Sequence, residues 1–289
     1  MASSMRDIKA MLSATKKTSQ ITNAMNMVSA SKLRLAQKNA LSFYKYMQRV
    51  IDIISSLSSQ GSKLNHPLLK EREVKRTCYV MISSDRGLAG SFNANINKLV
   101  MNNLGKDDYV IPFGMKAYYY AKSKHLKSYL DESISLPDDV GFDSILDLIT
   151  KCVKGFLKGD FDSLVLVYNH FVNTLKIVPT LQQVLPIAPD FEADEEKKKA
   201  MAIYEFDDSV ESMLDTILPL YLENVVYGVI LDSKASEHAS RMSAMKNATD
   251  NAEKLIEKLE LRYNIARQAA ITSELTDIVS GSKAINGGN

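Results

Sequence analysis

A glycine-containing turn after an apolar run is the part of this sequence that comes nearest to ligand chemistry. Residues 77–83 (TCYVMIS) are apolar and β-rich, and an amphipathic segment begins at Asn93. The turn between them contains Asp85, Arg86, Gly87 and Gly90. A turn before a helix N-terminus can hold a phosphate, because backbone N–H groups and the helix dipole favour anions there. The segment has neither a GxGxxG pattern nor the Lys-Ser/Thr of a P-loop. We expect a tight strand-to-helix turn stabilised by Asp85 and Arg86, with phosphate binding as the alternative.

A second candidate combines aromatic and basic side chains. Tyr118–Tyr120 lie among the lysines at 116, 122, 124 and 127, a mixture that also occurs on nucleic-acid-binding surfaces. On a helix the three tyrosines would spread over about 200°. We therefore expect one or two of them to pack on a sheet and the lysines to form a solvated face.

The remaining reactive side chains predict no catalytic, cofactor or metal site. The acidic pairs at 107–108 and 138–139 lie in turn contexts, and no carboxylate has a predicted acid–base partner. The four histidines are scattered, with no carboxylate or serine expected beside any of them; they are His66, His125, His170 and His238. Cys78 and Cys152 lie in apolar surroundings, and we expect both to be reduced core residues.

Composition is that of an ordinary folded protein with an uneven charge distribution. The 289 residues are 45% hydrophobic and 24% charged, and no run of eighteen apolar residues predicts a membrane span. Residues 1–60 carry nine Lys/Arg against two Asp/Glu, which gives +7. Residues 207–289 carry eight against thirteen, which gives −5. The two ends should therefore attract each other, and the basic end should present positive charge to its surroundings.

Apolar residues at both ends of the chain follow the 3-4 spacing of a coiled coil. The C-terminal seam is Ala235, His238, Met242, Met245, Thr249, Ala252, Ile256, Leu259, Tyr263, Ala266 and Ala270. The N-terminal seam is Leu33, Ala36, Ala40, Phe43, Met47, Val50, Ile54 and Leu57, preceded by another seam of Ile21, Val28 and Leu35 with Met25 between them. We expect the two terminal helices to wind together as a thin shaft, because small residues crowd the seams.

Between the ends, short apolar runs alternate with amphipathic segments. Strands are expected at 77–83, 109–113 and 164–168, with an edge strand or hairpin arm near 176–187, and helices between them. The fold class is therefore α/β: a long antiparallel coiled coil of the N- and C-terminal helices plus a small Rossmann-like α/β domain. The expected division is a shaft helix over 1–60, an α/β domain with its linkers over 61–206, and a second shaft helix over 207–289.

Two local features of the C-terminal helix are expected from its glycine and proline residues. Pro219 predicts a kink, and Gly281 predicts the end of the helix. The tail at 284–289 is expected to be disordered.

Four stretches of this sequence resemble the γ subunits of F-type ATP synthases. They are residues 18–32 (TSQITNAMNMVSASK), 84–90 (SDRGLAG) with Asn93, 236–251 (SEHASRMSAMKNATDN) and 263–281 (YNIARQAAITSELTDIVSG). The similarity follows the chain in order over essentially its whole length. The resemblance implies a rotor subunit whose coiled coil turns inside a hexamer of α and β subunits, and whose α/β domain lies with ε on the ring of c subunits. A γ subunit couples proton flow to ATP synthesis or hydrolysis on β, and it makes and breaks no bonds itself.

The resemblance also implies which positions contact the β subunits. By their match to the family's motifs these are Met25, Lys32, Arg241, Arg267, Gln268, Thr272 and Glu274. They are interface residues, and the resemblance implies no catalytic residue, cofactor or metal.

Location and alternatives follow from the same comparison. The connector at 190–206 has no cysteine pair, unlike the redox-regulated chloroplast type, and the first residues enter a helical pattern without a presequence. We expect a peripheral protein on the cytoplasmic face of a bacterial plasma membrane. The alternatives are a nucleotide-binding enzyme using the turn at 85–90 and a passive coiled-coil scaffold.

Overall fold

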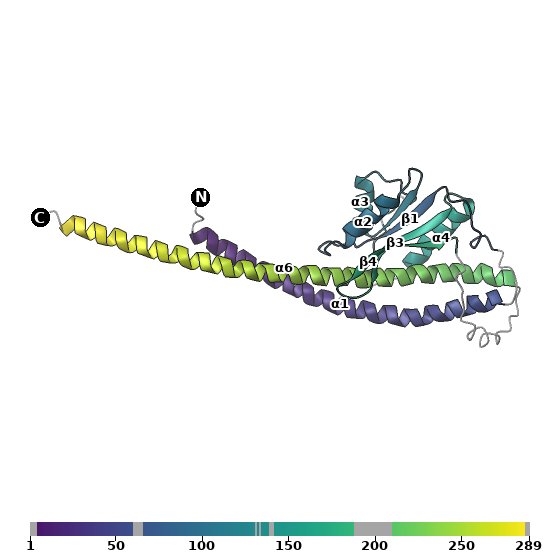
Figure 1. The fold of residues 1–289 in the computed structure, drawn as a ribbon, viewed down its shortest axis with the longest axis horizontal. Helices are drawn as coiled ribbons and strands as arrows, with labels where there is room; N and C mark the ends of the chain where they lie inside the picture. Colours follow the sequence, from purple (N-terminus) through teal and green to yellow (C-terminus); the bar gives the residue numbers. More distant parts are fainter. Residues whose placement is uncertain are drawn as a thin grey trace. The chain divides into compact units, whose positions relative to one another are not determined.

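A computed structural model describes residues 5–59, 66–130, 132, 134–138, 142–187 and 210–286, without the side chains of 52–59, 142–144, 210–211 and 282–286. The long helices are α1 (Met5–Ser59) and α6 (Val210–Asn286) (Figure 1). Between them lie β1 (Thr77–Ile82), α2 (Phe92–Asn103), β2 (Tyr109–Phe113), α3 (Met115–Ser123), α4 (Phe142–Lys158), β3 (Ser163–Phe171) and β4 (Ile177–Leu185). The expectations for the connector at 190–206 and for the last three residues lie outside the described residues.

The chain forms two compact units, and both long helices contribute to each. One unit consists of residues 29–241 and contains the sheet. The other consists of residues 1–28 and 242–289 and contains one end of each long helix.

The larger unit is built on a mixed four-stranded sheet in the order β2-β1-β3-β4. β1 pairs in parallel with β2 and β3, and β4 returns antiparallel to β3 as an edge strand. Pro179 lies in β4, where an edge position tolerates a residue without an N–H donor. The α/β domain and its strand positions are therefore confirmed.

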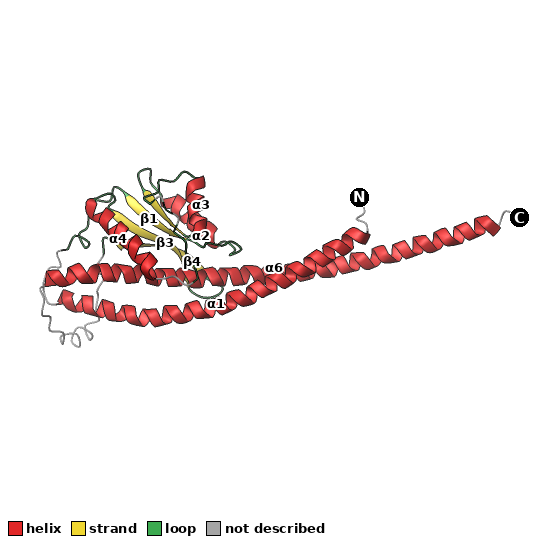
Figure 2. Cartoon of the chain, turned by 180° about the vertical axis from the view of Figure 1, so that it is seen from behind, coloured by secondary structure: helices red, strands yellow, loops and turns green. Residues whose placement is uncertain are grey.

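Helices cover both faces of this sheet, and β1 is therefore buried on both sides. Alternate side chains of a strand point to opposite faces. Cys78, Val80 and Ile82 lie in the core formed with α4 and the first part of α6, whereas Tyr79 and Met81 lie in the core formed with α2 and α3. Figure 2 shows the strands with these helices around them.

The first part of α6 is a core helix. Five of its side chains are nearly inaccessible to solvent at helical spacing: Leu214, Leu218, Leu222, Val226 and Ile230. Within the described residues, the stretch Ser212–Gly281 is long and apolar enough to cross a membrane by length and composition. Core helices of globular proteins meet the same criterion, and packing against the sheet accounts for these leucines. The helix α6 continues through Pro219, so the proline does not divide it into two helices.

In the larger unit, α1 packs along α6 through the expected N-terminal seam. Leu33, Ala36 and Val50 are buried, and the side chains of the expected positions Ile54 and Leu57 lie outside the described part of the chain. The ring of Phe43 meets Tyr227 edge-on, with centroids 4.9 Å apart, and a Cβ on Gly228 would lie 3.0 Å from the Phe43 ring. A glycine on α6 thus makes room for an aromatic ring on α1.

The first half of α1 buries a different seam from the one expected from the sequence. Ile21, Val28 and Leu35 are 55–60% exposed, so that proposed seam is wrong. The less exposed positions of residues 5–28 are Ile8, Leu12, Thr15, Ser19, Thr22, Met25 and Asn26. Leaving Met25 aside, these step by 4 and 3, so the spacing is that of a coiled coil but the residues are mostly small and polar. Apolar character alone selected the wrong face of the helix.

The helix pair in the smaller unit is antiparallel. Lys16 on α1 forms a 2.7 Å ion pair with Glu260 on α6, and the hydroxyl of Thr22 lies 2.7 Å from that of Thr249. The α6 seam is confirmed through Ala266, with Met245, Thr249, Ala252 and Leu259 buried. Ala270 is exposed, so the seam ends earlier than expected.

The end of α6 also differs from the expectation. The helix continues through Gly281 to Asn286, so Gly281 does not end it and residues 284–286 are helical. A glycine inside an exposed helix costs only about 1 kcal/mol relative to alanine, and the flanking residues sustain the helix. Every residue from 267 to 281 is exposed.

Candidate functional site

The turn after β1 is held by its own polar groups. The amide oxygen of Asn93 accepts hydrogen bonds from the backbone N–H and the hydroxyl of Ser84, at 3.1 Å each. The Ser84 hydroxyl also lies 2.6 Å from the carbonyl oxygen of Arg86. Leu88 and Gly90 have φ of 60° and 55°, a conformation that tightens the turn. This is the tight strand-to-helix turn expected from the sequence, although Arg86 is exposed and contributes its carbonyl oxygen, not its charge, to the hydrogen bonds described.

Asp85 points from this turn to the start of α3. Its carboxylate accepts hydrogen bonds from the backbone N–H of Met115 at 2.9 Å, the N–H of Leu136 at 2.9 Å and the hydroxyl of Ser135 at 2.6 Å. Burial raises the pKa of Asp85, but these hydrogen bonds and the charge of Lys234 outweigh it and leave the pKa below the ordinary value. Asp85 is therefore an ionised structural group.

The first N–H groups of α3 are all occupied by this turn. Met115 donates to Asp85, Lys116 donates to the carbonyl of Ser84 at 3.1 Å, and Ala117 donates to the hydroxyl of Ser83 at 2.8 Å. Gly114 precedes them with φ of 102°, and a Cβ there would lie 2.3 Å from the Ser83 carbonyl oxygen. The donors at the start of α3 therefore have partners inside the chain. The helix that the sequence placed after this turn is α2, and there the N–H of Phe92 donates to the carbonyl oxygen of Ala89 at 3.1 Å.

A charged row on α6 lies against the same turn. Arg241 donates to the carbonyl oxygen of Gly87 at 3.4 Å and to the carboxylate of Glu237 at 2.8 Å. Lys234 donates to the carbonyl oxygen of Leu136 at 2.6 Å and pairs with Glu237 at 3.0 Å. The Lys234 and Glu237 side chains are each only 4% exposed, so their charges must compensate each other.

Asp138 connects this row to α1. One carboxylate oxygen of Asp138 lies 2.5 Å from the ammonium of Lys32, and the other lies 3.5 Å from Nε2 of His238. Burial raises the pKa of Asp138, but the Lys32 hydrogen bond and the charges of His238 and Lys234 bring it below the ordinary value. We call Lys32, Asp138, Lys234, Glu237, His238 and Arg241 the charged junction.

The histidines correct an expectation made from the sequence. Three of them lie beside carboxylates: His66 by Asp215 at 3.0 Å, His170 by Asp232 at 2.7 Å and His238 by Asp138 at 3.5 Å. The partners are distant in sequence, so no local pattern could have revealed these pairs. Each pair joins two segments of the larger unit, and among the described residues no group of three or more His, Cys, Asp or Glu side chains is arranged to hold a metal.

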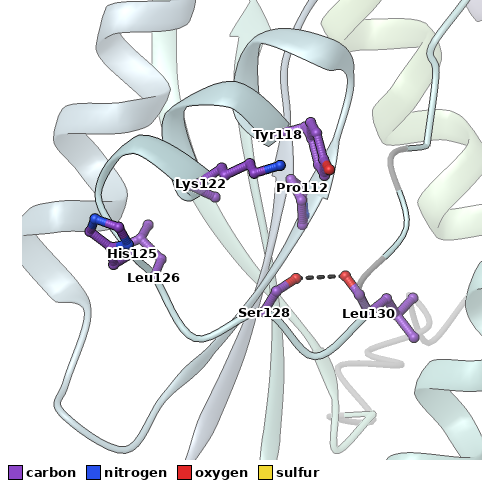
Figure 3. A pocket seen from close by; sticks show the side chains of 8 residues that line it. Pro112, Tyr118, Lys122, His125, Leu126, Ser128 and Leu130 are labelled. Carbon is purple, nitrogen blue, oxygen red and sulfur yellow. Dashed lines mark hydrogen bonds between the residues drawn. The ribbon is translucent and has the colours of Figure 1, made fainter.

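A surface cavity of about 460 Å³ lies beside α3 (Figure 3). Tyr118, Lys122 and His125 line it from the helix and its end, and Pro112 and Ser128 line it from the opposite side. Lys122 lies 5.8 Å from the Tyr118 ring centroid, and the Ser128 hydroxyl donates to the carbonyl of Leu130 at 2.6 Å. Tyr119 is 59% exposed and Tyr120 packs on the sheet side, as expected for a solvated lysine face.

The two cysteines are buried in the core between the sheet and α4. Both thiols are free. Burial raises the pKa of Cys78 well above its ordinary value and that of Cys152 to about 12. They are therefore unreactive core residues, which confirms the expectation.

The positions expected to contact β fall into two groups. Lys32 and Arg241 belong to the charged junction in the larger unit. Met25 is half-buried in the smaller unit, and four positions near the end of α6 are fully exposed: Arg267, Gln268, Thr272 and Glu274. The structure thus brings Lys32 and Arg241 into one network that sequence reasoning did not foresee.

Comparison with protein-family models gives one match over nearly the whole chain. The ATP synthase family model matches residues 4–285. The match includes both long helices and the sheet.

Solved structures similar to this chain come from mitochondrial ATP synthases. A chain of the central stalk and c-ring structure from Tetrahymena thermophila is 27% identical, with a TM-score of 0.56, over 79% of this chain and 99% of that chain. A chain of the OSCP, F1 and c-ring structure from Euglena gracilis is 18% identical, with a TM-score of 0.68, over 98% and 95%. A chain of the Euglena gracilis rotor structure is 16% identical, with a TM-score of 0.62, over 92% and 98%. At 18% and 16% identity, the Euglena matches show a shared fold.

Proposed function

This chain belongs to the ATP synthase gamma family, and we propose on that premise that it is the central-stalk rotor subunit of an F-type ATP synthase. In this role it couples proton flow through the membrane ring to ATP synthesis or hydrolysis by turning inside the αβ hexamer. Its partners are the α and β subunits, ε and the c-subunit ring, with one copy per complex.

One observation in the smaller unit carries the proposal. Past the point where α1 begins, α6 continues as an exposed helix with large apolar side chains at Ile271, Leu275, Ile278 and Val279, each 50–61% exposed. Such a run of exposed apolar side chains indicates a surface that another protein covers. A sleeve formed by the αβ hexamer would cover this helix on all sides.

The small seam of the helix pair supports a slim rotor. Thr15, Ser19, Thr22 and Asn26 replace the leucines that would maximise stability, and small side chains let two helices approach closely. Outside this seam, α1 leaves Met11, Ile21 and Val28 at 55–60% exposure. We propose that these outward side chains, like the end of α6, face the hexamer.

The seven positions taken from the family's motifs keep their proposed role at the β interface, in two ways. Arg267, Gln268, Thr272 and Glu274 are exposed and would contact β directly, together with Met25. Lys32 and Arg241 are engaged inside this chain, so we propose that they act by fixing the helices that carry the contacts.

We propose that the chain carries out no bond chemistry of its own. The groups of the turn at 85–90 bind one another and the start of α3, and ATP is made and broken on β. The proposed division remains a shaft helix over 1–60, an α/β domain over 61–206 and a second shaft helix over 207–289.

The complex is membrane-associated, and we propose that this chain is a peripheral subunit on the cytoplasmic face of a bacterial plasma membrane. Both cysteines of the chain are core residues. This supports a type without the redox-regulated cysteine pair of chloroplast γ subunits. Low-ionic-strength washing of membrane fractions should release the chain together with α and β, and a chain found in another compartment would contradict this location.

Reconstitution tests the proposed function. All other subunits of the ATP synthase, reconstituted in vesicles, should hydrolyse ATP with proton pumping only when this chain is added. Turnover and pumping indifferent to the chain would refute the rotor function. Equilibrium dialysis with ATP or NAD separates the nucleotide-binding alternative, since tight one-to-one binding to the isolated chain would favour an enzyme. Crosslinking the shaft to β separates the scaffold alternative, since a locked scaffold loses no turnover whereas a locked rotor stops.

A further inference from the structure

We infer that Asp138 is a positioning residue that locks both long helices to the α/β domain, so that torque passes between them. The inference rests on the proposed rotor function. Sequence patterns place Asp138 in an ordinary turn, and its role follows from the contacts that its carboxylate makes in the larger unit.

The two oxygens of Asp138 serve two different helices. Lys32 of α1 lies 2.5 Å from one oxygen, and His238 of α6 lies 3.5 Å from the other. Lys32 is 106 residues from Asp138 in sequence, so this one side chain joins three distant segments. Among the ion pairs of the described residues, Asp138 is the carboxylate that meets both α1 and α6.

The segment that carries Asp138 is itself fixed to the domain. The N–H of Leu136 donates to Asp85 in the turn after β1, and its carbonyl accepts from Lys234 on α6. The Ser135 hydroxyl adds a 2.6 Å hydrogen bond to Asp85. The segment 134–136 is thus tied on one side to the turn after β1 and on the other to α6, and Asp138 extends this connection to α1.

Stability alone does not account for the Lys32 contact. The Lys32 and Asp138 side chains are 39% and 44% exposed, and such pairs contribute little to folding because water screens them. The seam beside Lys32 buries Leu33 between two small residues, Ser29 and Ala36. The directional ion pair between Lys32 and Asp138 adds to this packing a fixed position of α1 relative to the segment that carries Asp138.

The test uses the complete ATP synthase complex reconstituted in vesicles, with variants of this chain in place of the wild-type chain. With Asp138→Asn, ATP hydrolysis and assembly should stay at the wild-type level. The number of protons pumped per ATP should fall about two- to fivefold. This is the factor by which one partly exposed ion pair shifts the equilibrium between a state with α1 fixed to the domain and a state with α1 displaced from it. Lys32→Met, which keeps an apolar stem but removes the charge, should give the same loss.

Conservative and control variants separate positioning from a general structural effect. Asp138→Glu and Lys32→Arg keep the charges and should restore pumping. Asp147→Asn on α4 breaks a comparable surface pair, which lies at 2.8 Å with Lys151, and should leave pumping unchanged. If Asp138→Asn prevents assembly, Lys32→Met carries the test.

The outcomes separate this inference from the proposed function. If the wild-type chain restores coupled pumping and both Asp138→Asn and Lys32→Met also pump at the wild-type ratio, the inference about Asp138 is wrong and the rotor function stands. Equal losses in Asp138→Asn and Asp147→Asn would also overturn the inference. If the wild-type chain itself restores no pumping, the rotor function fails first.

Discussion

The hydroxyl oxygens of Thr22 on α1 and Thr249 on α6 lie 2.7 Å apart across the seam of the smaller unit. Each hydroxyl also lies near a carbonyl of its own helix, Ser19 at 3.1 Å and Met245 at 3.0 Å. Since a hydroxyl has one hydrogen, one threonine donates to the other, and the second donates to its own helix. The two helices therefore meet at this level through a polar contact.

This contact predicts non-additive effects of threonine substitutions. Thr22→Val or Thr249→Val should each destabilise the full chain by about 1 kcal/mol, because one hydroxyl loses its partner in the seam. The double substitution should cost less than the two single costs together, because two valines of similar shape pack without an unpaired hydroxyl. Chemical denaturation followed by helical circular dichroism measures all three. Additive losses would show that the hydroxyls do not interact.

A glycine substitution tests the approach of α3 to the turn after β1. Gly114→Ala should cost about 3 kcal/mol or more, because its φ is 102° and the new Cβ would lie 2.3 Å from the Ser83 carbonyl oxygen. The midpoint of denaturant unfolding, which reports the free energy of unfolding, should fall accordingly.

Two other glycines provide matched controls for Gly114. Gly159 has φ of 80°, and a Cβ added there would have no atom within 4 Å, so Gly159→Ala should cost about 1 kcal/mol from the backbone conformation alone. Gly281 is helical and equally open, so Gly281→Ala should stabilise the end of α6 by up to about 1 kcal/mol. A Gly114→Ala cost no larger than that of Gly159→Ala would contradict the predicted close approach.

Asp85 predicts an acid-sensitive contribution to stability. Its folded pKa lies below the ordinary 3.8, so the contribution is fully present above about pH 4 and is lost as the pH falls through the folded pKa. Asp85→Asn should cost about 1–2 kcal/mol at pH 7, because an amide has one acceptor oxygen for three donors. In the variant, the free energy of unfolding should also decrease less steeply as the pH falls below about 5. An unchanged slope between pH 5 and about 3 would argue against an ionised Asp85.

His238 predicts a second pH effect at higher pH. Burial lowers the pKa of its imidazole from 6.5; the charges of Glu237 and Asp138 oppose this shift, and those of Lys234 and Arg241 add to it. A depressed folded pKa gives stability that is present above about pH 6.5 and is lost as the pH falls through the folded pKa. His238→Gln should therefore reduce the fall in melting temperature, measured by calorimetry, as the pH decreases from 7.5 to about 5. A variant with the same pH dependence as the wild type would exclude His238 as the source.

Periodicity and turn chemistry predicted most of the fold. The expected strands at 77–83 and 109–113 agree with the structure within a residue or two, because their apolar, β-rich runs are distinct from the helical segments. The α6 seam was also predictable through Ala266, since its members are apolar or small. The end of α6 was not, because a glycine signals a helix end only when it adopts the left-handed conformation that a sequence does not reveal.

The seam of α1 and the charged junction show where sequence reasoning fails. The apolar pattern predicted a seam of Ile21, Val28 and Leu35, whereas the less exposed positions of this part of α1 include threonine, serine and asparagine. If the 3-4 spacing of residues 33–50 is extended towards the N-terminus as far as Ile8, it predicts the face that the structure buries. Nothing local indicates that Asp138 meets Lys32 and His238, since the fold alone brings these distant residues together.

Rotation of a single complex tests the rotor function most directly. Leu175, at the β3–β4 turn, is 95% exposed, so Leu175→Cys offers a reactive thiol, whereas the native Cys78 and Cys152 are buried. With the αβ hexamer fixed to glass and a bead attached at this cysteine, ATP should drive continuous rotation in one direction, and Asp138→Asn should still allow it without load. Beads that only fluctuate while the hexamer hydrolyses ATP would contradict the account.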